Sequence, residues 1–419
     1  MSLVETLLEE FHDILAETQN TTPRNFSFPA AETMIKVAIG VRRCGKTYFL
    51  YQFIHELLNQ GILLERILFI NFEDDRLLPM DQKSLATLLD SFYTLYPDNH
   101  QHRCYLFLDE IQNVEDWQLV IRRFFDTKNV QIYLTGSSAK LLSKEIATSL
   151  RGRSISIEIW PYNFDEYLSM LHFAKPKNPI GKMRLDKLRH HFLTFLKKGG
   201  FPAIQNLSES LQRETLQNYL ETVIFRDVIE RHRVTNIVLL RYLTNHLLKN
   251  FAATFSSNKF YNDIKSQGYQ VAKDTIYHYL EYLEDAYLIS TVPLFTESLR
   301  RSQITSKKIY SVDNGLTQAN SFSQSENLGR LLENQVYLDL RREKKKIFYY
   351  LTKSGYEIDF LTQSLDGKME FIQVVWDRND AATLAREERA LKEAKSELNI
   401  PGKIIDLEAY LKNNSQKMS

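Results

Sequence analysis

Cysteine is scarce in this chain of 419 residues, which contains only Cys44 and Cys104. Small secreted domains that depend on disulfides are rich in cysteine, so this count argues against a disulfide framework. The sequence also lacks an uninterrupted apolar run of about 18 residues, the length that would indicate a membrane-spanning helix. Its first residues do not combine a basic segment with an apolar core. We therefore expect a cytoplasmic protein that does not insert into a membrane.

Glycine and proline are also infrequent, with 14 and 10 residues, which argues against long disordered linkers. Neither sign of charge dominates, because 53 Lys and Arg residues oppose 52 Asp and Glu residues. The net charge therefore gives no general attraction to nucleic acid or membranes, and any such surface must be local. The length exceeds what one hydrophobic core usually organises, which predicts two or three folded domains.

Short apolar runs rich in β-forming residues alternate with longer amphipathic stretches from about residue 33 to residue 160. This alternation is typical of an α/β fold, in which helices cover a parallel sheet. The predicted strands are Met34–Ile39, Ile67–Phe72, Tyr105–Leu108, Gln131–Leu134 and Ser154–Ile159.

A glycine, four residues and then Gly-Lys-Thr follow the first predicted strand, over residues 40–47. A predicted helix begins directly afterwards, which is the strand, loop and helix context of a P-loop. Such a loop directs backbone amides at phosphate oxygens. We expect Lys46 to contact the β- and γ-phosphates of ATP and Thr47 to bind Mg²⁺. The other predicted nucleotide-binding residues are Gly40, Arg42, Arg43, Gly45, Tyr48 and Ser137.

Two carboxylates, Asp109 and Glu110, end the third predicted strand. Beside a P-loop, Asp109 is expected to hold Mg²⁺ and Glu110 to act as the general base for the attacking water. A plain solvated loop is the alternative interpretation. The second strand also ends in acidic residues, of which Glu73 could tune the metal or water, but a solvated turn is favoured there.

Hydroxyl groups and arginines follow the fourth predicted strand. Thr135–Ser138 could sense a γ-phosphate or a water molecule. Arg153 is the first candidate, and Arg151 the second, for an arginine that reaches the γ-phosphate of a neighbouring subunit. That role would require a homo-oligomer. An ordinary ion pair with surface carboxylates is the alternative.

Further motifs accompany these residues along nearly the whole chain. The complete set is Arg42-Arg43, Ile70–Asp74, Leu108–Gln112, Trp117, Leu134–Ser138, Leu150–Arg153, Pro161–Tyr167, Gly199–Pro202 and Tyr310–Leu316. The set resembles the AAA-plus type ATPases of bacteria and archaea that carry a C-terminal domain of unknown function. The resemblance implies a sensor role for Thr135–Ser138 and an arginine-finger role near Arg153. It implies no particular substrate.

The remaining chain changes character at about residue 161, where helical periodicity replaces the strand pattern. The predicted division is an N-terminal helical segment (1–32), a P-loop ATPase core (33–160), a helical lid (161–248), a winged helix (249–320) and a small α/β domain (321–419). The last domain resembles the restriction-endonuclease fold.

The predicted winged helix offers a possible DNA-binding surface. Lys273, Thr275 and His278 could face a groove, and four basic residues are expected to contact phosphates along the wing. These four are Arg300, Arg301, Lys307 and Lys308. The alternative is a winged helix used for packing or for sensing the nucleotide state, because the same helix carries several carboxylates that repel phosphate.

The C-terminal domain contains candidates for a nuclease site, namely Glu333, Asp359 and Gln373. An active site of this kind needs a lysine two residues after Gln373, but Val375 occupies that position. Unless a lysine such as Lys353 moves in, the site lacks its cation. A degenerate domain that binds nucleic acid or a partner is therefore favoured over an ATP-regulated nuclease.

Together these features predict Mg²⁺-dependent ATP binding and hydrolysis, coupled to a nucleic-acid or protein partner. A nucleotide-gated DNA-binding switch with slow hydrolysis is the alternative. The two classes differ in whether turnover or DNA affinity is the output.

Overall fold

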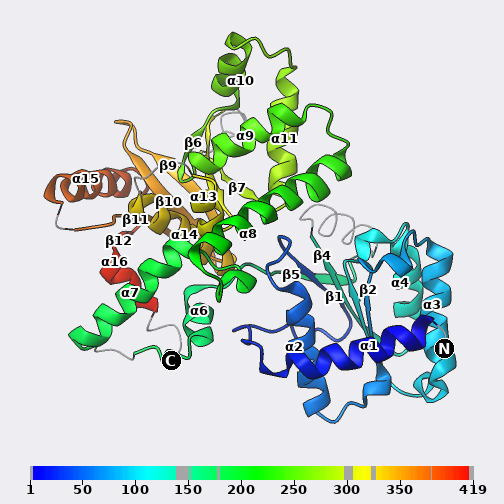
Figure 1. Cartoon of the computed structure of the whole chain (residues 1–419). Coiled ribbons are helices and arrows are strands. Elements are labelled where there is room, and N and C mark those ends of the chain that lie inside the picture. The colour runs from blue at the N-terminus through cyan, green and yellow to red at the C-terminus, as the bar shows by residue number, and fades with distance from the viewer. Residues whose placement is uncertain are drawn as a thin grey trace. The chain divides into compact units, whose positions relative to one another are not determined.

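The computed structural model describes residues 3–137, 150, 152–176, 180–296, 305–321, 327–378 and 380–414. The chain forms two compact units (Figure 1). Unit 1 comprises Met1–Trp160 with Asp285–Tyr287, and unit 2 comprises Pro161–Glu284 with Leu288–Ser419. Within the described ranges, every helix is too short or too polar to cross a bilayer.

Unit 1 contains a five-stranded parallel sheet with the order β2-β3-β4-β1-β5. The strands are β1 (Ile35–Ile39), β2 (Ile67–Asn71), β3 (Cys104–Asp109), β4 (Val130–Gly136) and β5 (Ser154–Glu158). Nearly every residue of β1 to β4 is buried, as expected when both faces of a parallel sheet are covered. The predicted α/β fold is therefore confirmed for this unit.

The helices of unit 1 lie around this sheet (Figure 1). They are α1 (Leu3–Glu17), α2 (Lys46–Asn59), α3 (Gln82–Leu95) and α4 (Trp117–Thr127). The prediction of a helical segment over residues 1–32 was too long, since α1 and a short 3₁₀ turn end at Asn20. Pro23 and Pro29 disfavour helix beyond that point. Phe28 instead packs on Phe49 of α2, with ring centroids 4.8 Å apart.

Unit 2 begins with helices. They are α6 (Phe164–Met170), α7 (Lys182–Lys198), α8 (Glu209–Thr222), a π-helical continuation (Val223–Glu230) and α9 (Ile237–Lys249). A capping box fixes the start of α6, because Asn163 and Glu166 each accept a hydrogen bond from the other's backbone N–H, at 2.8 and 2.9 Å.

A small antiparallel sheet follows, with the strand order β6-β8-β7. The elements are β6 (Ala253–Phe255), α10 (Ser257–Ser266), α11 (Lys273–Asp285), β7 (Ile289–Val292) and β8 (Lys307–Ser311). The winged helix remains a prediction for this region. Arg300 and Arg301 of the predicted wing lie outside the described residues.

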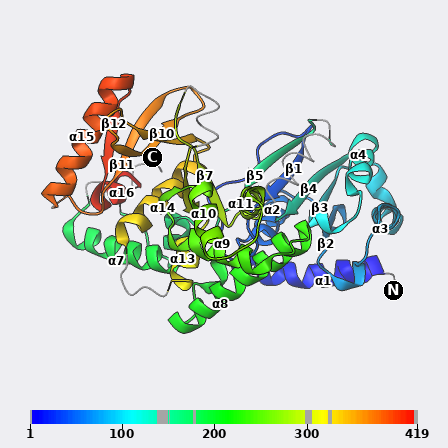
Figure 2. The ribbon, with the colours of Figure 1, turned by 90° about the horizontal axis from the view of Figure 1, so that it is seen from above.

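The C-terminal part of unit 2 contains a four-stranded sheet with the order β12-β11-β10-β9, in which only β11 and β12 are parallel. Its elements are α13 (Asn314–Ala319), α14 (Leu328–Arg342), β9 (Lys346–Leu351), β10 (Glu357–Gln363), β11 (Met369–Val374), α15 (Ala381–Leu398), β12 (Gly402–Ile405) and α16 (Leu407–Asn414). Figure 2 shows α15 and α14 on opposite sides of the sheet. Strand β12 was not predicted from the sequence, because its residues are exposed or half-buried and lack a clear alternation.

Two motifs that are far apart in the sequence meet inside unit 2. The backbone N–H of Gly200 donates to Asp313 Oδ2 at 2.6 Å. A Cβ at Gly199 would lie 2.1 Å from Asp313 Oδ1, and a Cβ at Gly315 would lie 2.2 Å from the carbonyl oxygen of Lys198. These glycines therefore allow the backbones after α7 and before α13 to approach closely.

Candidate active site

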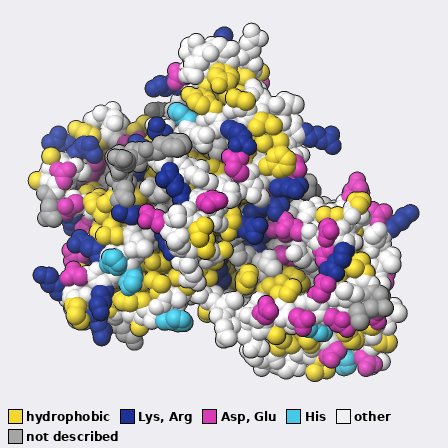
Figure 3. All heavy atoms as spheres, in the orientation of Figure 1, with side chains coloured by type: hydrophobic (Ala, Val, Ile, Leu, Met, Phe, Trp, Pro, Cys, Tyr) yellow, Lys and Arg dark blue, Asp and Glu magenta, His cyan; other side chains and the backbone are white. Residues whose placement is uncertain are grey.

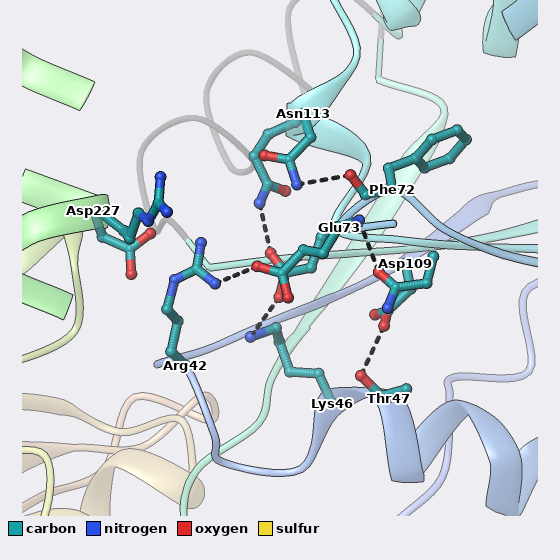
Figure 4. A network of polar contacts seen from close by, with 12 residues as sticks. Arg42, Lys46, Thr47, Phe72, Glu73, Asp109, Asn113 and Asp227 are labelled. Carbon is teal, nitrogen blue, oxygen red and sulfur yellow. Dashed lines mark hydrogen bonds and ion pairs between the residues drawn. The ribbon is translucent and has the colours of Figure 1, made fainter. Parts of the chain in front are cut away.

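The strand order of unit 1 brings the predicted site segments together. β4 lies between β1 and β3, so the P-loop, Thr135 to Ser137, and Asp109 with Glu110 follow three adjacent strands. The carboxyl ends of parallel strands meet at one edge of the sheet, which is where ligands bind in open α/β folds. Figure 4 shows Thr47 and Asp109 facing one another at this edge, with Lys46 beside them.

The backbone of the P-loop depends on two glycines. Gly45 precedes α2 with φ of 99°, in the left-handed region that glycine adopts without strain. A Cβ at Gly40 would lie 2.1 Å from the carbonyl oxygen of Ile159. Because both positions exclude larger side chains, the loop can turn tightly and direct amides of the first turn of α2 at a phosphate.

Lys46 is buried within the site and contacts groups of its own chain. Its Nζ lies 3.1 Å from Glu110 Oε1 and donates to the carbonyl oxygens of Gly40 and Val41 at 3.2 and 3.4 Å. Burial lowers the pKa of Lys46, but the negative charges around it, foremost that of Glu110 and then that of Asp109, together outweigh burial, so the pKa is raised and the ammonium stays charged. This ammonium must leave Glu110 to reach a phosphate.

Asp109 lies between two hydroxyl groups. Thr47 Oγ1 donates to Asp109 Oδ2 at 2.7 Å, and Thr135 Oγ1 donates to Oδ1. Burial, with the nearby charge of Glu110, raises the pKa of Asp109 to about 6. Mg²⁺ prefers hard oxygen ligands, so the adjoining hydroxyl of Thr47 and carboxylate of Asp109 fit this ion.

Glu110 has the left-handed backbone conformation, with φ of 52°, which is uncommon for residues other than glycine. Its backbone N–H donates to Thr135 Oγ1 at 2.9 Å, and its Oε2 accepts from Gln112 Nε2 at 2.5 Å. Burial would raise the pKa of Glu110, but Lys46, Arg42 and Gln112 together lower it. Glu110 is therefore a carboxylate, the form that can accept a proton.

Glu73, at the end of β2, forms an ion pair with Arg42 of the P-loop. The side chain is 43% exposed in a turn, which agrees with the favoured interpretation of a solvated turn. Asn113 Nδ2, in the turn after β3, donates to the carbonyl oxygen of Phe72, which follows β2, at 3.1 Å (Figure 4). This hydrogen bond connects the ends of the two neighbouring strands.

The other predicted nucleotide-binding residues occupy the same edge. Arg43 belongs to the P-loop turn with φ of 67°. Tyr48 lies in the first turn of α2 with 55% of its surface exposed, and Ser137 is buried just beyond β4. Ser138 lies outside the described residues.

Arg153 lies at the opposite edge of the sheet from the P-loop. Its carbonyl oxygen accepts from the N–H of Ile35, at the start of β1, at 2.8 Å. Its guanidinium pairs with Asp126 and remains 47% exposed. Arg153 therefore does not face the P-loop of its own chain, and only a neighbouring subunit's loop fits the predicted role. Arg151 lies outside the described residues.

A second polar cluster lies in unit 2, around Lys308. Its Nζ is 2.7 Å from Glu333, 2.9 Å from Glu357 and 3.0 Å from Asp359. Burial lowers the pKa of Lys308, but these carboxylates raise it well above its ordinary value. Lys308 is buried among these carboxylates, so the prediction that it contacts DNA phosphates was wrong. Its neighbour Lys307 is half-buried.

The three predicted nuclease-site residues are close together in this cluster. Asp359 Oδ2 accepts from the N–H of Val374 at 2.9 Å, and Gln373 Oε1 accepts from the N–H of Asp359 at 3.1 Å. Together with Glu333 they line a cavity of about 920 Å³. Lys308 supplies the cluster's ammonium, whereas the suggested Lys353 is exposed.

Lys308 was missed as a member of this cluster because it comes from β8, which precedes the predicted C-terminal domain. The only sequence signal was its place in an apolar strand beside Ile309 and Tyr310. Among the described residues, no group of three His, Cys, Asp or Glu side chains is arranged to hold a metal ion.

Comparison with known proteins agrees with the geometry of unit 1. Residues 32–168 match the family described as AAA domain, and residues 189–326 match a domain of unknown function, DUF8612. The fold and these matches define an AAA-type P-loop ATPase. The DUF8612 match spans α7 to α13, and neither match gives evidence for a nuclease-like fold.

Two relatives extend the similarity over most of the chain. The uncharacterized protein MJ1544 of Methanocaldococcus jannaschii is 36% identical over 97% of this chain and 88% of its own length. An uncharacterized protein of Haemophilus influenzae is 31% identical over 82% of each chain. The chain therefore belongs to the same family as these proteins, and its residues 32–168 are an AAA domain.

Solved structures give a weaker likeness. The Walker-type ATPase PABY2304 of Pyrococcus abyssi overlays on 74% of this chain and 94% of its own, with 14% identity and a TM-score of 0.44.

Proposed function

We propose that the protein hydrolyses ATP in a Mg²⁺-dependent reaction and couples its nucleotide state to a nucleic-acid or protein partner. The main observation behind this proposal is that a buried cation, a pair of oxygen ligands suited to a metal ion and a charged carboxylate lie close together at one edge of the sheet. Lys46 lies 3.1 Å from Glu110, and Thr47 lies 2.7 Å from Asp109. This combination serves phosphoryl transfer, which needs positioning and charge stabilisation more than covalent chemistry.

Each side chain has one role in the proposed reaction. Lys46 leaves Glu110 and binds the β- and γ-phosphates. Thr47 and Asp109 would hold Mg²⁺, which would supply positive charge near the phosphate oxygens. Glu110 then orients a water molecule and accepts its proton. Departure of Lys46 also releases Glu110 Oε1, so the base becomes available when phosphate arrives.

The test measures phosphate release and ATP affinity separately. We expect Lys46→Ala to lose both, since its ammonium contacts the phosphates, and Glu110→Gln to keep ATP binding while turnover falls about 10²-fold or more. Matched controls are Lys83→Ala and Glu115→Gln, which change exposed residues of unit 1. Normal turnover by Glu110→Gln would remove the general-base assignment.

For the partner, we propose nucleotide-dependent binding of DNA through the region from α9 to β8. The element order α9, β6, α10, α11, β7, β8 and the sheet order β6-β8-β7 support a winged helix there. Lys273, at the start of α11, is an exposed candidate for a phosphate contact. Duplex binding should weaken steeply with salt and in Lys273→Ala. Equal, negligible binding in every nucleotide state at low salt would point to a protein partner.

For the C-terminal cavity we propose a binding role without cleavage. Lys308 has three N–H donors, and three carboxylates lie within 3.0 Å of its nitrogen. The ammonium is therefore fully engaged, and its raised pKa prevents it from acting as a base. Plasmid incubated with Mg²⁺ or Mn²⁺ should stay intact. Cleavage that disappears in Asp359→Ala would establish a nuclease instead.

A further inference from the structure

Gln112 contains a buried hydrogen-bond acceptor that no described residue satisfies. It lies in the 3₁₀ turn Ile111–Asn113, directly after Glu110. Its Nε2 donates to Glu110 Oε2 at 2.5 Å, whereas its Oε1 is buried without a hydrogen-bond partner. The unsatisfied oxygen thus belongs to a side chain that already contacts the proposed general base.

The orientation of this amide is fixed by its neighbour. An ionised carboxylate only accepts hydrogen bonds, so the NH₂ group of Gln112 must face Glu110 and the oxygen must point elsewhere. Leaving a buried acceptor unsatisfied costs free energy, because the oxygen has lost its hydrogen bonds to water without replacing them. Such a group at a site for chemistry is expected to meet a donor from the substrate or its water.

The two oxygens of Glu110 are held by different partners. Lys46 contacts Oε1, and Gln112 contacts Oε2. When Lys46 moves to the phosphates, Oε1 is released while Oε2 stays bound to the amide. Gln112 therefore keeps the carboxylate in place at the step when its free oxygen is needed.

We propose that Gln112 positions Glu110 through Nε2 and also accepts a hydrogen bond from the attacking water through Oε1. The inference rests on the proposed hydrolysis and adds a residue to it. One O–H of the water points at Glu110, which takes that proton, and the other points at Gln112. The water oxygen forms the new bond to the γ-phosphorus, and the bond to the β,γ-bridging oxygen breaks, its electron pair leaving with ADP.

The adjacent amide provides a matched control. Asn113 lies in the same turn, but its Nδ2 donates to the carbonyl oxygen of Phe72 at 3.1 Å. Asn113→Leu therefore disturbs the turn to a similar degree without removing a group from Glu110. Gln112→Leu removes both proposed contacts, and Gln112→Met does so with a side chain of nearly the original length.

The experiment is single-turnover hydrolysis at saturating ATP, with ATP affinity and thermal unfolding measured on the same proteins. We expect Gln112→Leu and Gln112→Met to slow hydrolysis ~10- to 100-fold, in the range of one lost transition-state contact, while affinity and unfolding remain near wild type. Asn113→Leu should stay within a few-fold of wild type. Near-normal rates in both Gln112 variants, or an equal loss in Asn113→Leu, would overturn the proposal.

A double variant separates this inference from the proposed function. Because Gln112 is proposed to hold both Glu110 and the water that Glu110 deprotonates, Gln112→Leu should slow the Glu110→Gln protein less than it slows wild type. Full multiplication of the two effects would show an independent role and contradict the inference. If Glu110→Gln is slow while the Gln112 variants are normal, only the inference fails. Normal hydrolysis by Glu110→Gln would reject the general base and, with it, the role of Gln112.

Discussion

At the scale of single residues, both units place a buried lysine among carboxylates, with different consequences. Lys46 has one carboxylate neighbour, Glu110, and two backbone carbonyls, which a phosphate can replace. Lys308 has three carboxylates within 3.0 Å. The first arrangement can open for a ligand, whereas the second satisfies every donor of the ammonium.

Lys308→Met is predicted to destabilise unit 2 by about 3–5 kcal/mol, because it leaves buried carboxylates without their cation. Burial and the charge of Asp359 already raise the pKa of Glu333 to about 7 with the lysine present. Hydrogen exchange of the backbone amides in β10 and α14, which carry Asp359 and Glu333, measures this loss of stability locally. Lys307→Met, one residue earlier in β8, is the control and should have a small effect. Equal effects of the two substitutions would contradict a structural role for the cluster.

The sequence could predict residues whose function depends on a contiguous motif. Lys46, Thr47, Asp109 and Glu110 were placed together because a P-loop and an acidic strand end are local patterns with a known meeting point. The positions of Lys308 and of the Gly199 backbone depend on segments more than 20 residues away in the chain, such as Glu333 and Asp313. No local pattern specifies such contacts, since they arise only when the elements pack.

At the scale of elements, the joint between α7 and α13 depends on the absence of side chains. Gly199→Ala is predicted to destabilise unit 2 by more than about 1 kcal/mol, since its φ is 81° and its Cβ would lie 2.1 Å from Asp313 Oδ1. Gly181→Ala, at the start of α7, is the control because nothing lies within 4 Å of its Cβ. Urea unfolding of the two variants measures the difference in their free energies of unfolding. Similar midpoints for both variants would show that the joint is not needed.

The same joint predicts a pH dependence. Burial raises the pKa of Asp313 to about 6, above its ordinary value of 3.8, although backbone N–H donors oppose the shift. Between these values the folded protein binds more protons than the unfolded chain, so stability falls as pH rises from about 4 to about 6. The free energy of unfolding of Asp313→Asn should lack this slope while being lower overall. An unchanged slope in the variant would assign the dependence to other groups.

At the scale of the whole molecule, the near-zero net charge is the sum of two opposite charges, because unit 1 contains 16 Lys and Arg against 22 Asp and Glu residues and unit 2 contains 37 against 30. Figure 3 shows side chains of both signs on the visible face of the molecule. Any attraction to DNA is therefore expected from local basic residues of unit 2, the unit that contains Lys273. The nucleotide site is similarly local, because every residue proposed for it except Arg153 lies at one edge of the sheet of unit 1.

Arg153 makes the oligomeric state part of the proposed mechanism. Because it lies at the sheet edge opposite its own P-loop, it is predicted to act on ATP bound by a neighbouring copy. The first measurement is mass in solution with and without a slowly hydrolysed ATP analogue. A strict monomer in both conditions would remove Arg153 from the mechanism.

Mixing two inactive variants gives the sharper test. Arg153→Ala keeps a complete P-loop, and Lys46→Ala keeps the arginine, so each alone should hydrolyse little ATP. Mixed assemblies should regain part of the activity, because some interfaces combine an intact loop with an intact arginine. Arg123→Ala, which changes an exposed arginine of α4, should remain active alone. Without recovery in mixtures that demonstrably exchange subunits, Arg153 would be only the surface ion-pair partner of Asp126.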